Sequence, residues 1–144
     1  MKIWNSDVKT AYLNAPIDCE IFVDQPEGFN CGGNYVWKLK KSLYGLKQSG
    51  RNWNSVLHDY LIHLGFIQSE VDNCVYSKIN SNCMMYMLVW VDDMIIACSD
   101  ENMLNETKNK LQSKFKLSDL GVLSYFLGIE FKFDKGIIKM NQSL

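Results

Sequence analysis

The chain has 144 residues, of which 47% are hydrophobic and 22% charged, a composition that fits one globular domain with a buried core. Its net charge of −1 gives the chain as a whole no attraction for nucleic acid. Five cysteines without Cys-x-x-Cys spacing argue against a zinc site and a disulfide framework. No apolar run is long enough to cross a membrane. We therefore expect an intracellular protein, cytoplasmic or nuclear, with no membrane partner.

The first third of the chain combines two short strands with a glycine-containing loop. Glu20–Val23 and Tyr35–Leu39 read as strands, and Gly28–Asn34 between them is the loop that we expect to be most mobile. Residues 28–58 contain no acidic side chain but carry five basic ones. This charge pattern indicates either a local basic face that binds a phosphate backbone or an ordinary solvated face.

Two helices are predicted from apolar residues that recur at steps of three and four. The first face is formed by Trp53, Val56, Leu57, Tyr60, Leu61 and Leu64. Gly65 follows and can end this helix in a left-handed conformation. A second helix is marked by Leu104, Leu111 and Phe115, and Asp100 is its expected N-cap.

Between the helices lies the most apolar part of the chain. Met84–Val91 and Met94–Cys98 read as strands buried on both faces. After the second helix, Asp119–Gly121 should turn the chain into a strand over Tyr125–Phe133. A hairpin at Asp134–Gly136 then leads to another strand. The predicted class is α+β, an antiparallel sheet with two helices packed on one face.

Asp92 and Asp93 separate the two apolar runs. Adjacent like charges repel each other, and partial burial increases that cost. Asp-Asp is also a poor choice for a two-residue hairpin turn, which favours Asn-Gly or Asp-Gly. A divalent cation would neutralise both charges, and Mg²⁺ is typically held by one or two carboxylates together with substrate phosphates. The alternative is an exposed polar turn without a ligand.

Asp7 is a second acidic position of interest, because it lies near a bend in another possible strand. Phosphoryl transfer with two metal ions needs carboxylates from separate strands that meet at one point. Asp7 and the Asp92-Asp93 pair would supply that geometry if the fold brings them together.

At these residues the chain resembles a known family, the copia-type retrotransposon reverse transcriptases. The segment from Asp7 to Asn14 is similar to the family's first catalytic motif, and Val91-Asp92-Asp93 resembles its third. Three further blocks resemble family segments in the family's order: Gln25–Phe29, Leu39–Gln48, and Asp119–Gly121 together with Tyr125–Glu130. The resemblance covers nearly the whole chain. It implies a polymerase palm-like (ferredoxin-like) fold and RNA-directed DNA synthesis.

The resemblance also implies site residues and ligands. Asp7 and Asp92 would hold two Mg²⁺ ions, with Mn²⁺ as the alternative. Asp93 would support the site, and the carbonyl of Val8 would add a metal ligand. The implied partners are an RNA template, a DNA primer, deoxynucleoside triphosphates and the remaining domains of a polyprotein.

Other positions match family residues that contact the substrates. Tyr12 would lie under the sugar and exclude a 2′-hydroxyl, although it also suits a core aromatic. Tyr44 and Gly45 match the turn beside the nucleotide, where a missing side chain permits close approach. The residues expected near the template or primer backbone are Lys47, Gln48 and Arg51, for which a solvated helix start is the alternative.

The chain departs from the family pattern in sequence and in extent. Trp90 stands where Tyr is usual, Gly50 stands where Pro is usual, and Asn14-Ala15 replaces Asn-Gly, a change that matters if the turn needs a positive φ. We expect residues 1–144 to form a single palm domain without fingers or thumb. Such a piece should be inactive alone, because catalysis needs substrates held in near-attack geometry. A domesticated or relic non-catalytic module that binds nucleic acid or protein is the second hypothesis.

Overall fold

The computed structural model describes residues 1–142. The chain forms two compact units. The sheet unit consists of residues 1–9 together with residue 61 onward, and the loop–helix unit consists of Thr10–Tyr60. Among residues 1–142, no helix combines the length and the apolar character that crossing a membrane requires.

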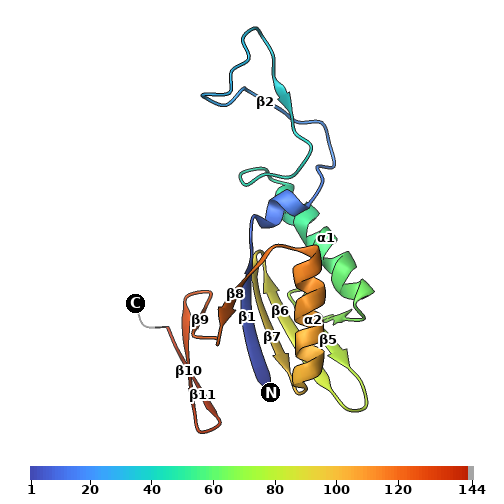
Figure 1. Ribbon diagram of the computed structural model, residues 1–144, viewed down its shortest axis with the longest axis vertical. Helices are drawn as coiled ribbons and strands as arrows, with labels where there is room; N and C mark the ends of the chain where they lie inside the picture. Colours follow the sequence, from blue (N-terminus) through green and yellow to red (C-terminus); the bar gives the residue numbers. More distant parts are fainter. Residues whose placement is uncertain (143–144) are drawn as a thin grey trace. The chain divides into compact units, whose positions relative to one another are not determined.

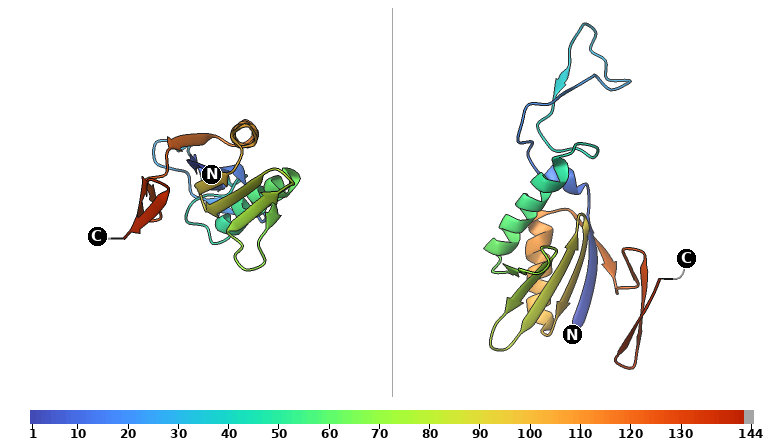
Figure 2. Two further views of the ribbon diagram at one scale, coloured as in Figure 1. Left: turned by 90° about the horizontal axis from the view of Figure 1, so that it is seen from below. Right: turned by 180° about the vertical axis from the view of Figure 1, so that it is seen from behind.

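The sheet unit is built on six strands in the order β4-β5-β6-β7-β1-β8, and every neighbouring pair is antiparallel (Figures 1 and 2). The strands are β1 (Lys2–Val8), β4 (Ile67–Gln68), β5 (Val75–Ile79), β6 (Met84–Trp90), β7 (Asp93–Cys98) and β8 (Leu117–Gly121). β1 begins the chain, yet it lies between β7 and β8. The expected α+β class with a large antiparallel sheet and two helices is confirmed.

One face of this sheet is buried and the other is largely open. Met85, Met87 and Val89 of β6 are buried, whereas Met84 and Tyr86 are exposed. β7 alternates in the same way, with Met94, Ile96 and Cys98 fully buried. The prediction that both apolar runs are buried on both faces is therefore wrong. These strands are continuous in apolar character, but their burial follows the period of two of an antiparallel sheet with one covered face.

The second predicted helix is α2 (Glu101–Lys114), which packs beside β7. Its N-cap is Asp100, as expected, and the Asp100 carboxylate accepts a 2.7 Å hydrogen bond from the backbone N–H of Met103. Leu104, Leu111 and Phe115 are buried. Helix propensity is modest in this polar segment, so burial of the apolar face holds the helix in place.

The end of the chain differs from the sequence-based expectation in two places. Asp119–Gly121 belongs to β8 rather than to a turn, and β8 pairs with β1 through a bulge opposite Asn5 and Ser6. The predicted strand Tyr125–Phe133 is two strands, β9 (Tyr125–Phe126) and β10 (Ile129–Asp134), joined at Leu127 and Gly128. Both turn residues have positive φ, 50° and 78°, and the apolar pattern concealed this turn because Leu127 is an unusual residue there.

The last hairpin is confirmed. β11 (Ile137–Asn141) pairs with β10, and Asp134 lies opposite Ile137. Lys135 and Gly136 form the turn with φ of 45° and 83°. Asp-Lys-Gly at this position follows the general rule that a two-residue hairpin loop needs residues that tolerate positive φ.

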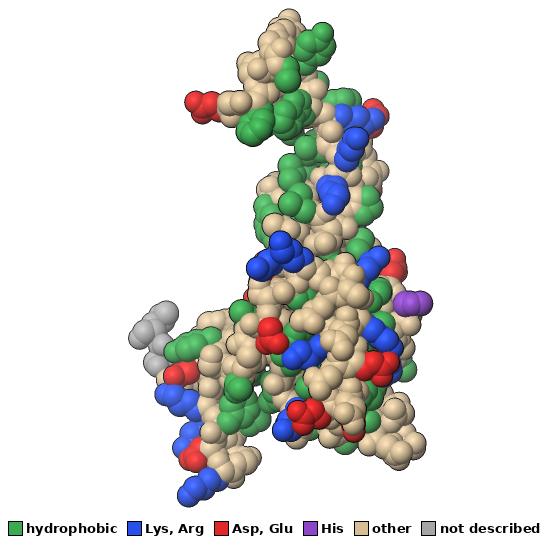
Figure 3. Space-filling model, viewed as in Figure 1, with side chains coloured by type: hydrophobic (Ala, Val, Ile, Leu, Met, Phe, Trp, Pro, Cys, Tyr) green, Lys and Arg blue, Asp and Glu red, His purple; other side chains and the backbone are tan. Residues whose placement is uncertain are grey.

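The loop–helix unit contains a short 3₁₀ helix η1 (Ala11–Asn14), β2 (Phe22–Val23) paired with β3 (Trp37–Lys38), and most of α1 (Ser49–His63). Both predicted strands are present in shortened form. Hydrophobic side chains are exposed on the β2–β3 hairpin (Figure 3). They include four large aromatic residues, Phe22, Phe29, Tyr35 and Trp37. Trp53 on α1 is buried, as expected of a core residue. Trp37 is exposed, because its short hairpin has too few residues to cover it.

Candidate active site

The centre of the candidate site lies where the neighbouring strands β1 and β7 pair. Asp7 and Asp93 are register partners in this antiparallel pair, so their side chains leave the sheet on the same face. The backbone N–H of Val8 donates a 2.7 Å hydrogen bond to the carbonyl of Asp92. Strand pairing thus brings Asp7 beside two acidic residues that lie far from it in sequence.

Burial and neighbouring charge both disfavour the ionised forms of Asp7 and Asp93. Burial raises the pKa of Asp7, the charge of Asp92 raises it further, and Lys9 counteracts both. Burial also raises the pKa of Asp93, with further contributions from Asp92 and Asp7. A cation bound between these groups would favour their ionised forms. The chemistry of the donor set therefore fits a divalent ion.

The carboxylates do not form a complete cage for a metal ion. Within residues 1–142, no group of three or more His, Cys, Asp and Glu side chains is arranged so that it could hold a metal ion. This arrangement is compatible with the way in which Mg²⁺ usually binds, through one or two carboxylates, water and substrate phosphates. The catalytic and metal-binding roles of Asp7, Val8, Asp92 and Asp93 stay predictions.

The turn between β6 and β7 lies one residue earlier than the sequence suggested. Trp90 pairs with Asp93, so Val91 and Asp92 are the central turn residues and Asp93 is the first residue of β7. Val91 has a φ of 55°, which is strained for a β-branched residue and costs about 1–3 kcal/mol. Strain of this kind persists only where the surrounding structure fixes the backbone. In this turn the strained conformation of Val91 determines the position of Asp92.

Replacing the strained residue should stabilise the fold. We expect Val91→Gly to raise the free energy of unfolding by about 1 kcal/mol, because glycine adopts positive φ without a steric penalty. Urea denaturation followed by circular dichroism measures the change. Val71→Gly is the matched control, because Val71 is 97% exposed and is not among the positive-φ residues of the described chain. A Val91→Gly protein less stable than the Val71→Gly protein would contradict the strain argument.

The residues expected to contact the nucleotide lie in the loop–helix unit. The rings of Tyr12 and Tyr44 lie against each other, with centroids 4.2 Å apart and planes inclined by 35°. Gly45 has a φ of 95°, and nothing lies within 4 Å of the place where a Cβ would be. Gly45 is thus required by backbone conformation and leaves open space beside Tyr44, which is 56% exposed.

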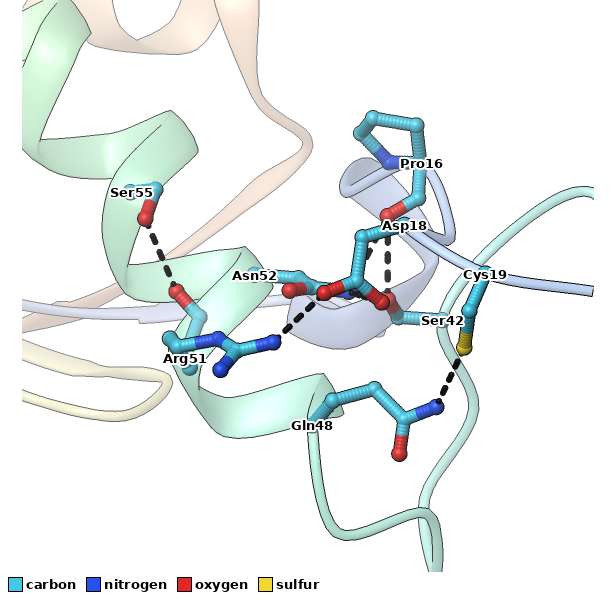
Figure 4. A network of polar contacts seen from close by, with 8 residues as sticks. All are labelled: Pro16, Asp18, Cys19, Ser42, Gln48, Arg51, Asn52 and Ser55. Carbon is cyan, nitrogen blue, oxygen red and sulfur yellow. Dashed lines mark hydrogen bonds and ion pairs between the residues drawn. The ribbon is translucent and has the colours of Figure 1, made fainter.

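Two of the three residues expected near a nucleic acid backbone already have partners within this unit. Arg51 forms an ion pair with Asp18, with a distance of 2.5 Å between Nη2 and Oδ2, and the Gln48 amide contacts the Cys19 sulfur (Figure 4). Lys47 is exposed. Gln48 and Arg51 therefore fasten the segment that follows Pro16 to the start of α1.

Sequence reasoning missed Asp18 and Asn52, which complete this network. The Asn52 amide donates to the Asp18 carboxylate, the Pro16 carbonyl and the Ser42 hydroxyl at 3.2–3.4 Å. Hydrogen bonds from Asn52 and Arg51 lower the pKa of Asp18. No sequence signal links an Asp and an Asn separated by a loop, so only the fold reveals the contact.

The two departures from the family pattern in this unit are accommodated. Ala15 has φ −98° and ψ 136°, an extended conformation in which glycine has no advantage. The left-handed residue is instead Thr10, with a φ of 52°. At Gly50 a Cβ would lie 3.7 Å from the Tyr12 hydroxyl, so this position has room for a side chain.

Comparison with known proteins agrees with this arrangement of motifs. The family model described as "Reverse transcriptase (RNA-dependent DNA polymerase)" matches residues 1–144. The chain is 40% identical over 128 residues to the retrovirus-related Pol polyprotein from transposon RE1 of Arabidopsis thaliana, which covers 88% of the chain and 9% of that protein.

Two further relatives come from tobacco and yeast. The identity is 36% with the retrovirus-related Pol polyprotein from transposon TNT 1-94 of Nicotiana tabacum, covering 90% of the chain and 10% of that protein. It is 34% with the transposon Ty1-BR Gag-Pol polyprotein of Saccharomyces cerevisiae, covering 90% of the chain and 8% of that protein. The chain thus spans a tenth or less of the length of these relatives. It belongs to the reverse transcriptase (RNA-dependent DNA polymerase) family, and to the copia-type retrotransposon members of that family.

Proposed function

We propose that this chain forms the palm of an RNA-directed DNA polymerase, which adds deoxynucleotides to a primer on an RNA template. The observation that carries the proposal is the register pairing of Asp7 with Asp93 beside Asp92. Burial and the charge of Asp92 raise the pKa of both Asp7 and Asp93. Placing these carboxylates together is therefore costly to the fold, and nucleotidyl transfer would explain why they are there.

The order of elements supports a palm-like, ferredoxin-like arrangement. Along the chain β1, α1, β6, β7, α2 and β8 follow one another, and the four strands lie side by side as β6-β7-β1-β8. This β-α-β-β-α-β succession is typical of split βαβ folds. β4 and β5 extend the sheet beyond β6.

In the proposed reaction Asp7 and Asp92 would hold the metal ions together with the Val8 carbonyl, and Asp93 would support their position. Two Mg²⁺ ions, or Mn²⁺ in their place, would acidify the primer 3′-hydroxyl and neutralise charge on the leaving pyrophosphate. The protein contributes pre-positioned carboxylates. The strained turn at Val91 and the hydrogen bond from the Val8 N–H to the Asp92 carbonyl fix the backbone positions from which those carboxylates project.

Residues of the loop–helix unit are proposed to receive the substrates. Tyr12, braced by Tyr44, would lie under the sugar and favour deoxynucleotides over ribonucleotides, and Gly45 would let the nucleotide approach the backbone. Lys47 would contact phosphates of the template or primer. Arg51 and Gln48 would contact them only by exchanging their present partners, Asp18 and Cys19, an exchange that costs little because exposed ion pairs are weak.

Primer extension tests the proposal. A chimaeric protein in which this chain replaces the matching segment of the transposon RE1 polyprotein should extend a DNA primer on an RNA template with Mg²⁺. We propose that the 144-residue chain tested by itself does not, because it spans about a tenth of that relative. A folded chimaera without activity would contradict the polymerase proposal, and robust extension by the short chain would contradict its inactivity.

Nothing in residues 1–142 favours the non-catalytic binding module over the polymerase interpretation. The exposed aromatic side chains of the β2–β3 hairpin and the nearby lysines suit a polymerase that holds a template as well as they suit a separate binding module.

A further inference from the structure

Two cysteine side chains meet at the end of the β6–β7 hairpin that is opposite the acidic turn. Cys83 directly precedes β6 and Cys98 is the last residue of β7. Their sulfur atoms are 3.4 Å apart, and both side chains are buried. Neither residue takes part in the proposed polymerase site, so the contact needs its own explanation.

The backbone holds this pair in place. Cys98 is the register partner of Met85, and the next residues are tied by a hydrogen bond from the Ser99 N–H to the Met84 carbonyl at 3.0 Å. The Met84 N–H in turn donates to the Ser99 hydroxyl at 2.9 Å. Cys83 and Cys98 therefore occupy diagonal positions on the buried face, where Cβ atoms come close enough for side chains to touch.

The two thiols differ in chemical character. The Ser99 hydroxyl donates to the Cys83 sulfur at 3.4 Å. This hydrogen bond, followed by one from Cys98, lowers the pKa of Cys83. Burial is the main cause that raises the pKa of Cys98. Cys83 is thus the thiol that ionises more readily and reacts first with an oxidant, whereas Cys98 keeps its proton until the second step, a combination that favours stepwise oxidation.

We propose that Cys83 and Cys98 form a redox-sensitive pair that closes into an intramolecular disulfide when hydrogen peroxide oxidises the protein. The Cys83 sulfur attacks one peroxide oxygen, the O–O bond breaks, and Cys83 becomes a sulfenic acid while one water is released. The Cys98 sulfur then attacks the Cys83 sulfur, the S–O bond breaks, and the hydroxyl leaves with the Cys98 proton as a second water. The two thiols lose two electrons, which reduce the peroxide.

The cross-link requires only a small movement. The sulfur atoms must approach from 3.4 Å to the disulfide bond length of about 2.05 Å. The Asn80–Cys83 turn, in which the Asn80 side chain accepts from the N–H groups of Asn82 and Cys83, is the segment that can adjust. The disulfide would close the hairpin that carries Asp92 at its other end.

Trypsin digestion can isolate the two cysteines in one peptide. No Lys or Arg occurs between Lys78 and Lys108, so trypsin releases one peptide, residues 79–108, that contains Cys83 and Cys98 and no other cysteine. The folded chain is treated with hydrogen peroxide, remaining thiols are alkylated, and the digest is analysed by mass spectrometry without reduction. We expect this peptide to be unalkylated and lighter by two hydrogen atoms, and expect reduction to restore two alkylation sites. Methionine oxidation adds oxygen and is therefore distinguished.

A second readout is stability. A disulfide that closes a loop of this length should raise the midpoint of thermal unfolding by about 5 °C or more. Cys98→Ala should lose both the mass change and the shift, and Cys74→Ala is the matched control that should keep both. Ser99→Ala should keep the ability to form the disulfide but slow its formation at neutral pH several-fold.

Three outcomes would overturn the proposal. The first is a peptide that stays fully alkylated in folded protein after peroxide treatment. The second is oxidation of Cys83 to a sulfinic acid without loss of hydrogen, and the third is a disulfide that links two chains. A Cys98→Ala chain that fails to fold leaves the mass measurement on the unaltered chain as a sufficient test.

Discussion

Asp92→Asn in the RE1 chimaera should reduce kcat for primer extension by about a thousandfold or more, because a metal-held carboxylate contributes several kcal/mol to transition-state stabilisation. The amide keeps the shape of the side chain and removes its charge. The backbone contact from Val8 to the Asp92 carbonyl does not involve the side chain, so the turn should keep its geometry. Steady-state extension of a labelled primer measures the effect.

Two further substitutions make this result specific. Asp93→Asn should reduce kcat by about tenfold to a hundredfold, since a residue that supports a metal ligand usually matters less than the ligand. Asp24→Asn is the matched control, because Asp24 is an exposed carboxylate in the loop–helix unit, and it should leave kcat unchanged. Equal activity of the Asp92→Asn and Asp24→Asn chimaeras would show that the β6–β7 turn is not the catalytic site.

Mg²⁺ should stabilise the 144-residue chain, by about 2.7 kcal/mol when its concentration exceeds the dissociation constant a hundredfold. The ion would bind the folded state, in which strand pairing brings Asp7 to Asp93, and would have no such site in the unfolded chain. Thermal unfolding in MgCl₂, compared with NaCl of equal ionic strength, separates binding from screening. Asp92→Asn should abolish the difference between the salts, and Asp24→Asn should preserve it. The same midpoint in both salts would contradict the metal site.

Without Mg²⁺, removal of a site carboxylate should raise the stability of the protein rather than lower it. Asp7→Asn should stabilise it by on the order of 1 kcal/mol at neutral pH, because it removes a partly buried charge that Asp92 repels. Loss of Mg²⁺ binding together with a gain in stability would distinguish a functional site from a structural ion pair.

The pH dependence of this difference follows from the raised pKa of Asp7 and Asp93. A carboxyl whose pKa is higher in the folded state than in the unfolded state binds protons preferentially when folded. The penalty that it imposes is fully present above the folded-state pKa and disappears as pH falls toward the ordinary pKa of an aspartate side chain. The stability gained by Asp7→Asn should therefore shrink on acidification, as urea denaturation between neutral and acidic pH can measure.

Local sequence signals predicted most of the secondary structure. The apolar spacing and Asp100 located α2 at Glu101–Lys114, and the spacing before Gly65 located α1. Asp-Lys-Gly identified the last hairpin. These features depend on residues within one or two turns of one another, so the pattern contains the necessary information. Each family motif is likewise a short local stretch, so the motifs and their order identified the family.

The sequence failed where a neighbouring strand or an unusual backbone conformation decides the outcome. Asp119–Gly121 looks like a turn but pairs with β1, and Leu127 disguises a turn because its φ of 50° is rare for leucine. The central residues of the β6–β7 turn were missed by one position, because Val91 accepts a strained φ that its side chain does not favour.

By itself the sequence determined the acidic residues, the order of the elements and the family, since all three are written in residue type and spacing. The tertiary structure alone decided that Asp7 lies opposite Asp93, that Arg51 is held by Asp18 and that Cys83 touches Cys98. Each is a contact between segments whose distance along the chain carries no information about distance in space. Antiparallel register and the burial of one sheet face supply that information.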